Sequence, residues 1–293
     1  MHHPVMLKEV LEHLNLKEGF TVADGTVGSG GHAAEILKRI TPGGRLVGID
    51  ADAAAIERSR KGLSGFEDSV RLIKDNFRNI DAVLFREKIK SVDAVLLDLG
   101  VSSDQIEDGG RGFSIKHNAR LDMRMDPDSP ASAYEIVNRY KERELDDIIG
   151  RYGEERFHSR IARTIIEERS ERPIETTYEL AAVIYKAVGS RYRKSRIDPA
   201  TRTFQALRIA VNDELGALEE GLKKAVSWLK SGGMICVISF HSLEDRIVKN
   251  LFKGYAGLGI LKIITKKPLV PSRQEISRNP RSRSAKLRVA ERI

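Results

Sequence analysis

The stretch DGTVGSGGHA, residues 24–33, follows an apolar segment and precedes a segment with helical spacing. It begins with an acidic residue, Asp24, and contains Gly28, Gly30 and Gly31. Glycine tolerates positive φ and lets a backbone approach a ligand closely. We therefore expect a ligand-binding turn between a strand and a helix, and the class of ligand follows from the rest of the sequence.

The first hundred residues alternate between strand-like and helix-like patterns. Apolar runs predict buried strands over 20–26, 44–52, 69–77 and 92–100, with helices over 32–40 and 53–63. Continuous apolar runs separated by helices are typical of a parallel sheet that is covered on both faces. Right-handed crossovers place the carboxyl ends of such strands at one edge, where open α/β sheets bind ligands.

This alternation stops after the fourth predicted strand. Residues 105–203 are rich in charge and helical spacing, without a comparable apolar strand. A long helix is expected over about 204–230, followed by strands over 232–240, 259–268 and 285–293, the last two forming a hairpin at a sheet edge. The sequence thus predicts an α/β core built from residues 1–104 and 204–293, interrupted by a helical domain, residues 105–203.

Composition excludes several classes of protein. No run approaches the roughly 20 apolar residues that cross a bilayer, and Lys8 and Glu9 lie where a signal peptide would be apolar. We expect a cytoplasmic protein that does not bind membranes. The single cysteine, Cys236, rules out an internal disulfide and a thiolate metal cluster, and no metal site is expected.

The net charge of +8 is concentrated in two segments. Residues 266–293 contain nine Lys and Arg against two Glu, and residues 186–208 contain seven Lys and Arg against one Asp. Basic clusters of this kind suit a polyanion, with nucleic acid as the first candidate. A solvated basic surface without a partner is the alternative.

Two common glycine motifs do not fit the turn. A phosphate-binding loop of the Walker type ends in Gly-Lys-Ser/Thr, whereas Gly31 is followed by His32. A dinucleotide fingerprint needs three glycines in a different spacing, although Asp50 is in range for a ribose. S-adenosylmethionine fits better, because it has no phosphate but has an amino-acid end, a ribose and an adenine.

S-adenosylmethionine would need four features at the ends of successive strands: an acidic residue, a glycine turn, a second acidic residue and an apolar surface. Asp24, the glycine turn, Asp50 for the ribose hydroxyls and Phe77 for the adenine occur in that order. Each residue also has a purely structural explanation: Asp50 as a helix cap, Phe77 as a core residue, and His32 as a surface residue at a helix start. The occurrence of all four features in this order favours a site for S-adenosylmethionine.

The fourth predicted strand ends in LLDLGVSSDQ, residues 96–105. In methyltransferases that act on exocyclic amines, this strand end carries an acidic or amide residue. Such an amine, for example that of cytosine, is a poor nucleophile because its lone pair is delocalised into the ring. An acceptor must therefore hold its N–H and turn the lone pair toward the methyl group. Asp98 is the candidate for this role, and in-line placement at about 3–3.5 Å would supply most of the rate. An equal alternative is that Asp98 only binds the cofactor, next to its sulfonium charge. Ser102 and Ser103 are interpreted as turn residues.

Longer blocks resemble one family, the bacterial 16S ribosomal RNA cytosine-N4 methyltransferases (RsmH, or MraW). The blocks are DGTVGSGGH, LLDLGVSS, RGFS (111–114), LDMRMD (121–126), YGEERF (152–157), PATRTFQALRI (199–209), VNDEL (211–215), ISFHSLEDRIVK (238–249) and NPRSRSAKLRVAER (279–292). The resemblance implies a Rossmann-like methyltransferase core with a mostly parallel seven-stranded sheet and an inserted helical domain for RNA recognition. It also implies methylation of cytidine 1402 in the decoding centre.

The resemblance carries the family's cofactor contacts onto seven positions: Gly30, Gly31, His32, Asp50, Phe77, Asp98 and Gln105. One position departs from the family, which usually has His where this chain has Asp198. An acid there would repel RNA phosphate if the position contacts RNA, whereas a structural position would tolerate it.

Other residues in these blocks have open roles. Ser242 and Asp245 fit a helix capping box, and His241 is a candidate contact to the target base or its sugar. Arg202 and Arg208 either hold phosphates or pair with acidic side chains. The same two roles are open for Arg111, Arg124 and the segment 280–283. Phe113 and Phe204 either stack on a base that leaves its stack or belong to the core.

The sequence therefore predicts an S-adenosylmethionine-dependent RNA cytosine-N4 methyltransferase whose partner is 16S rRNA in the small ribosomal subunit. A DNA amino-methyltransferase and a non-catalytic rRNA-binding assembly factor are the alternatives, and a nicotinamide dehydrogenase is a weaker third. The oligomeric state stays open, and a homodimer is among the states considered.

Overall fold

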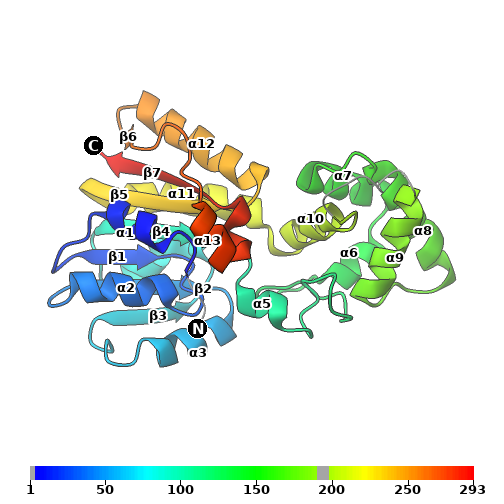
Figure 1. Ribbon diagram of the computed structural model, residues 1–293, viewed down its shortest axis with the longest axis horizontal. Coiled ribbons are helices and arrows are strands. Elements are labelled where there is room, and N and C mark those ends of the chain that lie inside the picture. The colour runs from blue at the N-terminus through cyan, green and yellow to red at the C-terminus, as the bar shows by residue number, and fades with distance from the viewer. Residues whose placement is uncertain (1–3, 190–197) are drawn as a thin grey trace. The chain divides into compact units, whose positions relative to one another are not determined.

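The computed structural model describes residues 4–189 and 198–293, and the chain divides into two compact units (Figure 1). The core unit comprises Met1–Gly100 and Leu215–Ile293, and the inserted unit comprises Val101–Glu214. The insertion therefore extends beyond the predicted 105–203 at both ends. Its later end moves because the helix that starts at Thr201 packs Phe204 and Leu207 into the hydrophobic core of the inserted unit.

The core unit is built on one seven-stranded sheet, in the order β3-β2-β1-β4-β5-β7-β6. The strands are β1 Thr21–Asp24, β2 Arg45–Asp50, β3 Val70–Lys74, β4 Val92–Asp98, β5 Leu229–Ser239, β6 Leu261–Ile263 and β7 Lys286–Arg292. β1 to β5 pair in parallel, whereas β7 pairs antiparallel with both β5 and β6. The predicted Rossmann-like, mostly parallel sheet is confirmed, and so is the edge pair formed by the last two strands.

Successive residues of the strands face opposite sides of the sheet, as the pleat requires. In β4, Ala94 and Leu96 join one hydrophobic cluster, whereas Val95 and Leu97 join the other. Helices that contribute to the first cluster are α1 Leu7–Leu14, α2 Gly31–Ile40 and α3 Ala53–Gly62. Helices that contribute to the second are α4 Ile80–Arg86, α11 Glu214–Trp228 and α12 Ser242–Gly257. Both faces are thus covered, which is why the strands read as continuous apolar runs.

The inserted unit is helical and has a hydrophobic core of its own. Its helices are α5 Ser103–Glu107, α6 Ala133–Arg139, α7 Glu142–Gly153, α8 His158–Glu171, α9 Thr177–Val188 and α10 Thr201–Asn212. Buried aliphatic side chains recur at helical spacing, for example Leu145 with Ile149 and Ile161 with Ile165. This is the pattern of amphipathic helices that pack around a shared interior.

The long helix predicted over about 204–230 is two helices, α10 and α11. Asp213, between them, has a left-handed backbone with φ +46°, which ends a right-handed helix. The side-chain amide of Asn212 donates to the carbonyls of Met123 and Arg208, and its carbonyl accepts from Met125 N. The break therefore ties α10 to the loop before α6, a tertiary effect that helical spacing cannot predict.

Two further predictions concern the single cysteine and the length of the apolar segments. Cys236 is buried in β5, as expected for a small core residue, and burial raises the pKa of its thiol. Within residues 4–189 and 198–293, no helix is both long and apolar enough to span a membrane.

Candidate active site at the carboxyl edge of the sheet

Three aspartates mark the carboxyl ends of neighbouring parallel strands. Asp24 ends β1, Asp50 ends β2 and Asp98 ends β4, and β1 lies between the other two in the sheet. The register pairs Asp24 with Gly48 of β2 and with Leu96 of β4, so the three ends meet at one edge. The structure thus brings together the acidic residues that the sequence placed at strand ends.

The glycine turn joins this edge to α2. Gly28 and Gly30 have φ of +54° and +83°, a conformation in which other residues are strained. The backbone N–H of Gly28 donates to Oδ2 of Asp50 at 2.9 Å, which fixes the turn against the end of β2. Gly31 is needed for another reason: a Cβ there would lie 2.7 Å from Cγ of Pro4.

Asp24 is almost completely buried, with 1% of its surface exposed. Its Oδ1 accepts the backbone N–H of Thr26 at 3.1 Å. Burial raises the pKa of the Asp24 carboxyl to about 7, and the charge of Asp50 adds to this effect, although the Thr26 hydrogen bond opposes it. Asp24 is therefore held close to the point at which it exchanges a proton near neutral pH.

Both carboxylate oxygens of Asp50 accept backbone hydrogen bonds, from Gly28 and from Asp52 at 2.9 Å each. Burial raises the pKa of Asp50 to about 6, against the lowering effect of these two bonds. The helix cap considered for Asp50 is wrong, because Asp52 caps α3 by accepting from Ala54 N. Each oxygen of Asp50 retains a lone pair with which it could accept from a hydroxyl.

Asp98 lies at the same edge, at the end of β4. Its backbone N–H donates to Thr26 Oγ1 at 2.6 Å, which places the residue beside the start of the glycine turn. Its side-chain Oδ1 is buried and accepts no hydrogen bond from any residue that the structure describes. Burial, followed by the negative charges of Asp24 and Glu244, raises the pKa of Asp98 well above its usual range.

His32 lies beside Asp98 and is 7% exposed, so the surface position considered for it is wrong. Its Nε2 donates to the carbonyl of Val5 at 3.0 Å, and its Nδ1 lies 3.7 Å from Oδ2 of Asp98. The imidazole therefore links the segment before α1 to the end of β4. This contact between residues 27 positions apart has no local sequence signal.

The segment after β5 contains an acidic residue that sequence reasoning missed. α12 is capped by His241 and Glu244, and the predicted capping box of Ser242 and Asp245 is wrong. Glu244 is 2% exposed, and its Oε2 accepts the backbone N–H groups of Phe240 and His241 at 2.8 and 3.2 Å. Asp245 instead pairs with Arg288 of β7 at 2.6 Å. A Glu three residues after the capping residue was the available signal.

Phe77 lies in a short 3-10 turn, η1 Phe77–Asn79, directly after β3. A Cβ at Gly221 of α11 would lie 2.7 Å from Phe77 Cδ2, and one at Gly25 would lie 3.0 Å from Phe77 Cβ. The ring is partly buried and packs on the cluster that contains α11. Phe77 therefore packs against the core, which is the structural role considered for it. Its contact with the adenine stays a prediction.

Comparisons with known proteins address the chemistry of this edge. Residues 1–293 match the sequence profile of a protein family that is described as the "MraW methylase family". The chain belongs to the MraW methylase family. It is 50% identical to the ribosomal RNA small subunit methyltransferase H of Carboxydothermus hydrogenoformans, covering 100% of this chain and 98% of the relative. The protein of that name from Sulfurihydrogenibium sp. is also 50% identical, covering 100% and 99%.

A solved rRNA methylase from Streptococcus thermophilus is similar at 11% identity and a TM-score of 0.45, covering 98% of this chain and 93% of the other. This likeness adds nothing to the family assignment. As a member of a methylase family, the protein is a methyltransferase, and the acidic edge of its sheet is the candidate active site.

Three predicted site residues belong to the inserted unit of this methylase. Gln105 is 6% exposed, and its side chain accepts from Ser102 N as part of the capping box of α5. Arg208 forms a two-pronged ion pair with Glu214, with N–O distances of 2.8 and 2.9 Å. Arg202 donates to the carbonyl of Glu154 at 2.8 Å. Pairing with an acidic group, the alternative considered for Arg208, is therefore what the structure shows.

Arg111 and Arg124 order the long loop of the inserted unit. Arg111 donates to the carbonyls of Arg124 and Met125, and Arg124 pairs with Asp122 at 2.7 Å. Among the aromatic candidates, Phe204 is buried and Phe113 packs on the same cluster. Both rings thus have the core role that was considered for them.

Asp198, which departs from the family, has a structural role. The hydroxyl of Tyr185 donates to its two oxygens at 3.1 and 3.0 Å, and the backbone N–H of Ala200 donates to Oδ1 at 2.8 Å. These bonds connect α9 to the start of α10. The structural interpretation of Asp198 is therefore supported.

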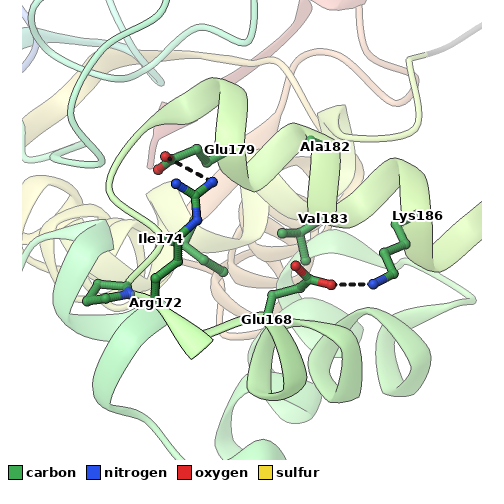
Figure 2. Close-up of a pocket in the computed structure, with 8 residues that line it drawn as sticks. Glu168, Arg172, Ile174, Glu179, Ala182, Val183 and Lys186 are labelled. Atoms are coloured by element: carbon green, nitrogen blue, oxygen red, sulfur yellow. Dashed lines mark hydrogen bonds and ion pairs between the residues drawn. The ribbon is translucent and has the colours of Figure 1, made fainter. Parts of the chain in front are cut away.

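A hollow in the inserted unit lies between α8 and α9 and the loop that joins them (Figure 2). Figure 2 shows its two cations facing acidic partners, Lys186 with Glu168 and Arg172 with Glu179. None of the predicted site residues lines it. Since its charges are paired and largely exposed, we interpret it as a surface feature of the helix packing.

The two basic segments differ in what the structure describes. Arg191, Arg193, Lys194 and Arg196 lie outside the described residues. In the core unit, the basic side chains of the later segment are exposed at positions 266, 267, 273, 278, 281 and 283. Arg288 is instead buried against Asp245. The exposed cations of residues 266–283 therefore form the basic surface of the core unit.

Proposed function

We propose that this methyltransferase transfers the methyl group of S-adenosylmethionine to N4 of a cytidine in 16S rRNA of the small ribosomal subunit. The names of the two relatives support small-subunit ribosomal RNA as the substrate. The resemblance of the sequence blocks to the family supports N4 of cytidine 1402 as the target, the cytoplasm as the compartment, and the inserted unit as an RNA-recognition domain.

The observation that carries the proposal is the unpaired Oδ1 of Asp98 among buried acidic groups. Buried charge is stable only when it is paired, and an acidic cluster of this kind favours a cation. S-adenosylmethionine is a net cation, because its sulfonium and ammonium outnumber its single carboxylate. A phosphate-bearing dinucleotide would add negative charge at the same edge, which the acidic cluster disfavours.

The residues available for the cofactor fit its parts. Asp50 would accept from the ribose hydroxyls with its remaining lone pairs, Phe77 would contact the adenine, and the turn at Gly30, Gly31 and His32 would border the amino-acid end. Asp98 would face the sulfonium. Gln105 is the seventh cofactor position that the family resemblance implies.

The chemistry needs one base and a defined geometry. Asp98 would accept an N–H of the exocyclic amine and so direct the nitrogen lone pair to the methyl carbon, with about 3–3.5 Å between the reacting atoms. The lone pair forms the new N–C bond while the electrons of the S–C bond return to sulfur, which leaves S-adenosylhomocysteine. The methylated nitrogen then releases one proton. The raised pKa of Asp98 suits it to receive that proton.

The decisive experiment incubates the protein with a labelled methyl donor and small subunits that lack the modification, followed by nucleoside mapping by mass spectrometry. We expect label only in N4-methylcytidine at a single position. Label in duplex DNA instead would favour a DNA amino-methyltransferase, and binding of subunits without transfer would favour an assembly factor. Calorimetry with S-adenosylhomocysteine checks the cofactor separately.

A further inference from the structure

Two buried polar atoms without hydrogen-bond partners lie at the ends of adjacent strands. They are Oδ1 of Asp98, the last residue of β4, and Nε2 of His241, two residues after β5, and neither forms a hydrogen bond with a residue that the structure describes. β4 and β5 pair with Asp98 opposite Ile238, and Leu99 N donates to Ile238 O at 3.0 Å. Buried polar atoms are rarely left unpaired, so each such atom calls for an explanation.

The hydrogen bonds of His241 define its tautomer. Its Nδ1 accepts the backbone N–H of Glu244 at 3.4 Å, so in the neutral ring the proton is on Nε2. Nε2 lies 3.3 Å from Oε1 of Glu244, an ion-pair distance without hydrogen-bond geometry. The same carboxylate holds the backbone N–H groups of Phe240 and His241. Glu244 therefore fixes both the main chain and the ring of His241.

The two atoms have complementary character: Asp98 offers an acceptor and His241 offers a donor. Cytosine presents the matching pair on its pairing edge, an amine donor at N4 next to an acceptor at N3. Uracil presents the reverse, a carbonyl acceptor next to an N–H donor. An acceptor and a donor fixed at the strand ends would therefore bind cytosine and reject uracil. With uracil, the Asp98 acceptor would face a carbonyl oxygen and the His241 donor would face an N–H, so neither hydrogen bond could form.

Resting on the proposed function, we propose that His241 is a specificity-determining residue that donates its Nε2–H to N3 of the acceptor cytosine while Asp98 Oδ1 accepts from N4. Glu244 is its positioning residue. Since both atoms are buried, the base reaches them only when the side chains that cover them move aside. A base extruded from its stack is commonly recognised through this edge.

The test pairs a protein variant with a substrate variant. His241→Leu removes the donor, and 3-deazacytidine at the target position removes the N3 acceptor. With wild type, we expect kcat/KM to fall about 10- to 100-fold on the 3-deaza substrate. With His241→Leu, kcat/KM should fall by a similar factor on the cytidine substrate and show no further decrease on 3-deazacytidine. Equal decreases from the substrate change in both proteins would overturn the proposal.

Controls separate this inference from a general defect. His13→Leu, in α1, changes a partly buried histidine whose Nδ1 contacts Glu9 O, and should leave both rates within about twofold. His241→Gln places a donor near Nε2 and should restore part of the original kcat/KM, and it substitutes for His241→Leu if that variant fails to fold. Affinity for S-adenosylhomocysteine should stay unchanged in every His241 variant. A wild type that does not methylate cytidine N4 would instead refute the proposed function.

The positioning role of Glu244 has its own measurement. Glu244→Gln keeps the length of the side chain but replaces one accepting oxygen with a donating NH₂. Nitrogen NMR of the imidazole should show the Nε2–H tautomer in wild type and a mixture of tautomers in the variant, together with a lower kcat/KM on cytidine. An unchanged tautomer with a normal kcat/KM would remove Glu244 from the proposal.

Discussion

Nδ1 of His32 lies 3.7 Å from Oδ2 of Asp98, although the two residues come from a helix start and a strand end 66 positions apart. His32 is fixed by its Nε2–H, which donates to Val5 O. His32 therefore lies beside a carboxyl whose pKa is raised by burial and by the charges of Asp24 and Glu244. We expect the protonation of Asp98 to affect methyl transfer.

Asp98→Asn tests the role of that carboxyl. It keeps the size of the side chain but cannot receive a proton, so we expect kcat to fall by about 10²- to 10⁴-fold. The fold should persist, because the amide has nearly the same size and shape as the carboxyl. The matched control is Asp93→Asn at the other end of β4, where Asp93 pairs with Lys230 and accepts from Thr21 N. That variant should lose stability and keep its kcat. Near-normal turnover of Asp98→Asn would refute the assigned role.

Stability should decrease with rising pH because of Asp24. Its folded pKa of about 7 lies above the ordinary value of 3.8, so the folded state holds the proton more tightly than the unfolded chain does. The resulting stabilisation is complete below about pH 4 and disappears as the pH rises through about 7, a difference of about 4 kcal/mol. Urea unfolding between pH 4.5 and 7.5 should show a less negative slope of stability against pH for Asp24→Asn. Identical slopes for the two proteins would contradict this assignment.

The basic surface of the core unit should contribute to RNA affinity. Reversing Arg278, Arg281 and Arg283 to Glu should weaken RNA binding and flatten the dependence of log K on log salt by about 0.7 for each RNA phosphate that is no longer neutralised. The control reverses three exposed lysines elsewhere in the core unit, Lys17, Lys61 and Lys90. Binding assays across a salt series compare the two triple variants. If both change affinity and slope equally, the surface acts only through net charge.

Arg208 should behave as a structural residue. The Arg208 side chain is 17% exposed and pairs with the Glu214 side chain, which is 9% exposed. Arg208→Met keeps the apolar stem but leaves the Glu214 carboxylate without this partner, so we expect a decrease of about 2–3 kcal/mol in unfolding free energy. RNA affinity of the folded variant should be unchanged. A large drop in affinity with unchanged stability would restore the phosphate-binding interpretation.

Local sequence was sufficient for the elements that position the site. Apolar runs predicted the strands that end at Asp24, Asp50 and Asp98, and the glycines predicted the turn. These features follow from residues close together in the chain: burial on both faces gives continuous apolar runs, and positive φ selects glycine. The family blocks led to the same core and to the same class of enzyme.

Contacts between distant segments were decided by the tertiary structure. Glu244 reaches the environment of Asp98, His32 reaches Val5, and the left-handed Asp213 separates α10 from α11. Local patterns specify which face of a helix or strand is apolar. They do not specify which polar atoms from different segments meet, or which are left unpaired, because that depends on the packing of the whole sheet edge. The sequence determined the scaffold and its acidic strand ends, whereas the packed fold decided how deeply these carboxyls are buried and brought Asp98 and His241 to the ends of adjacent strands.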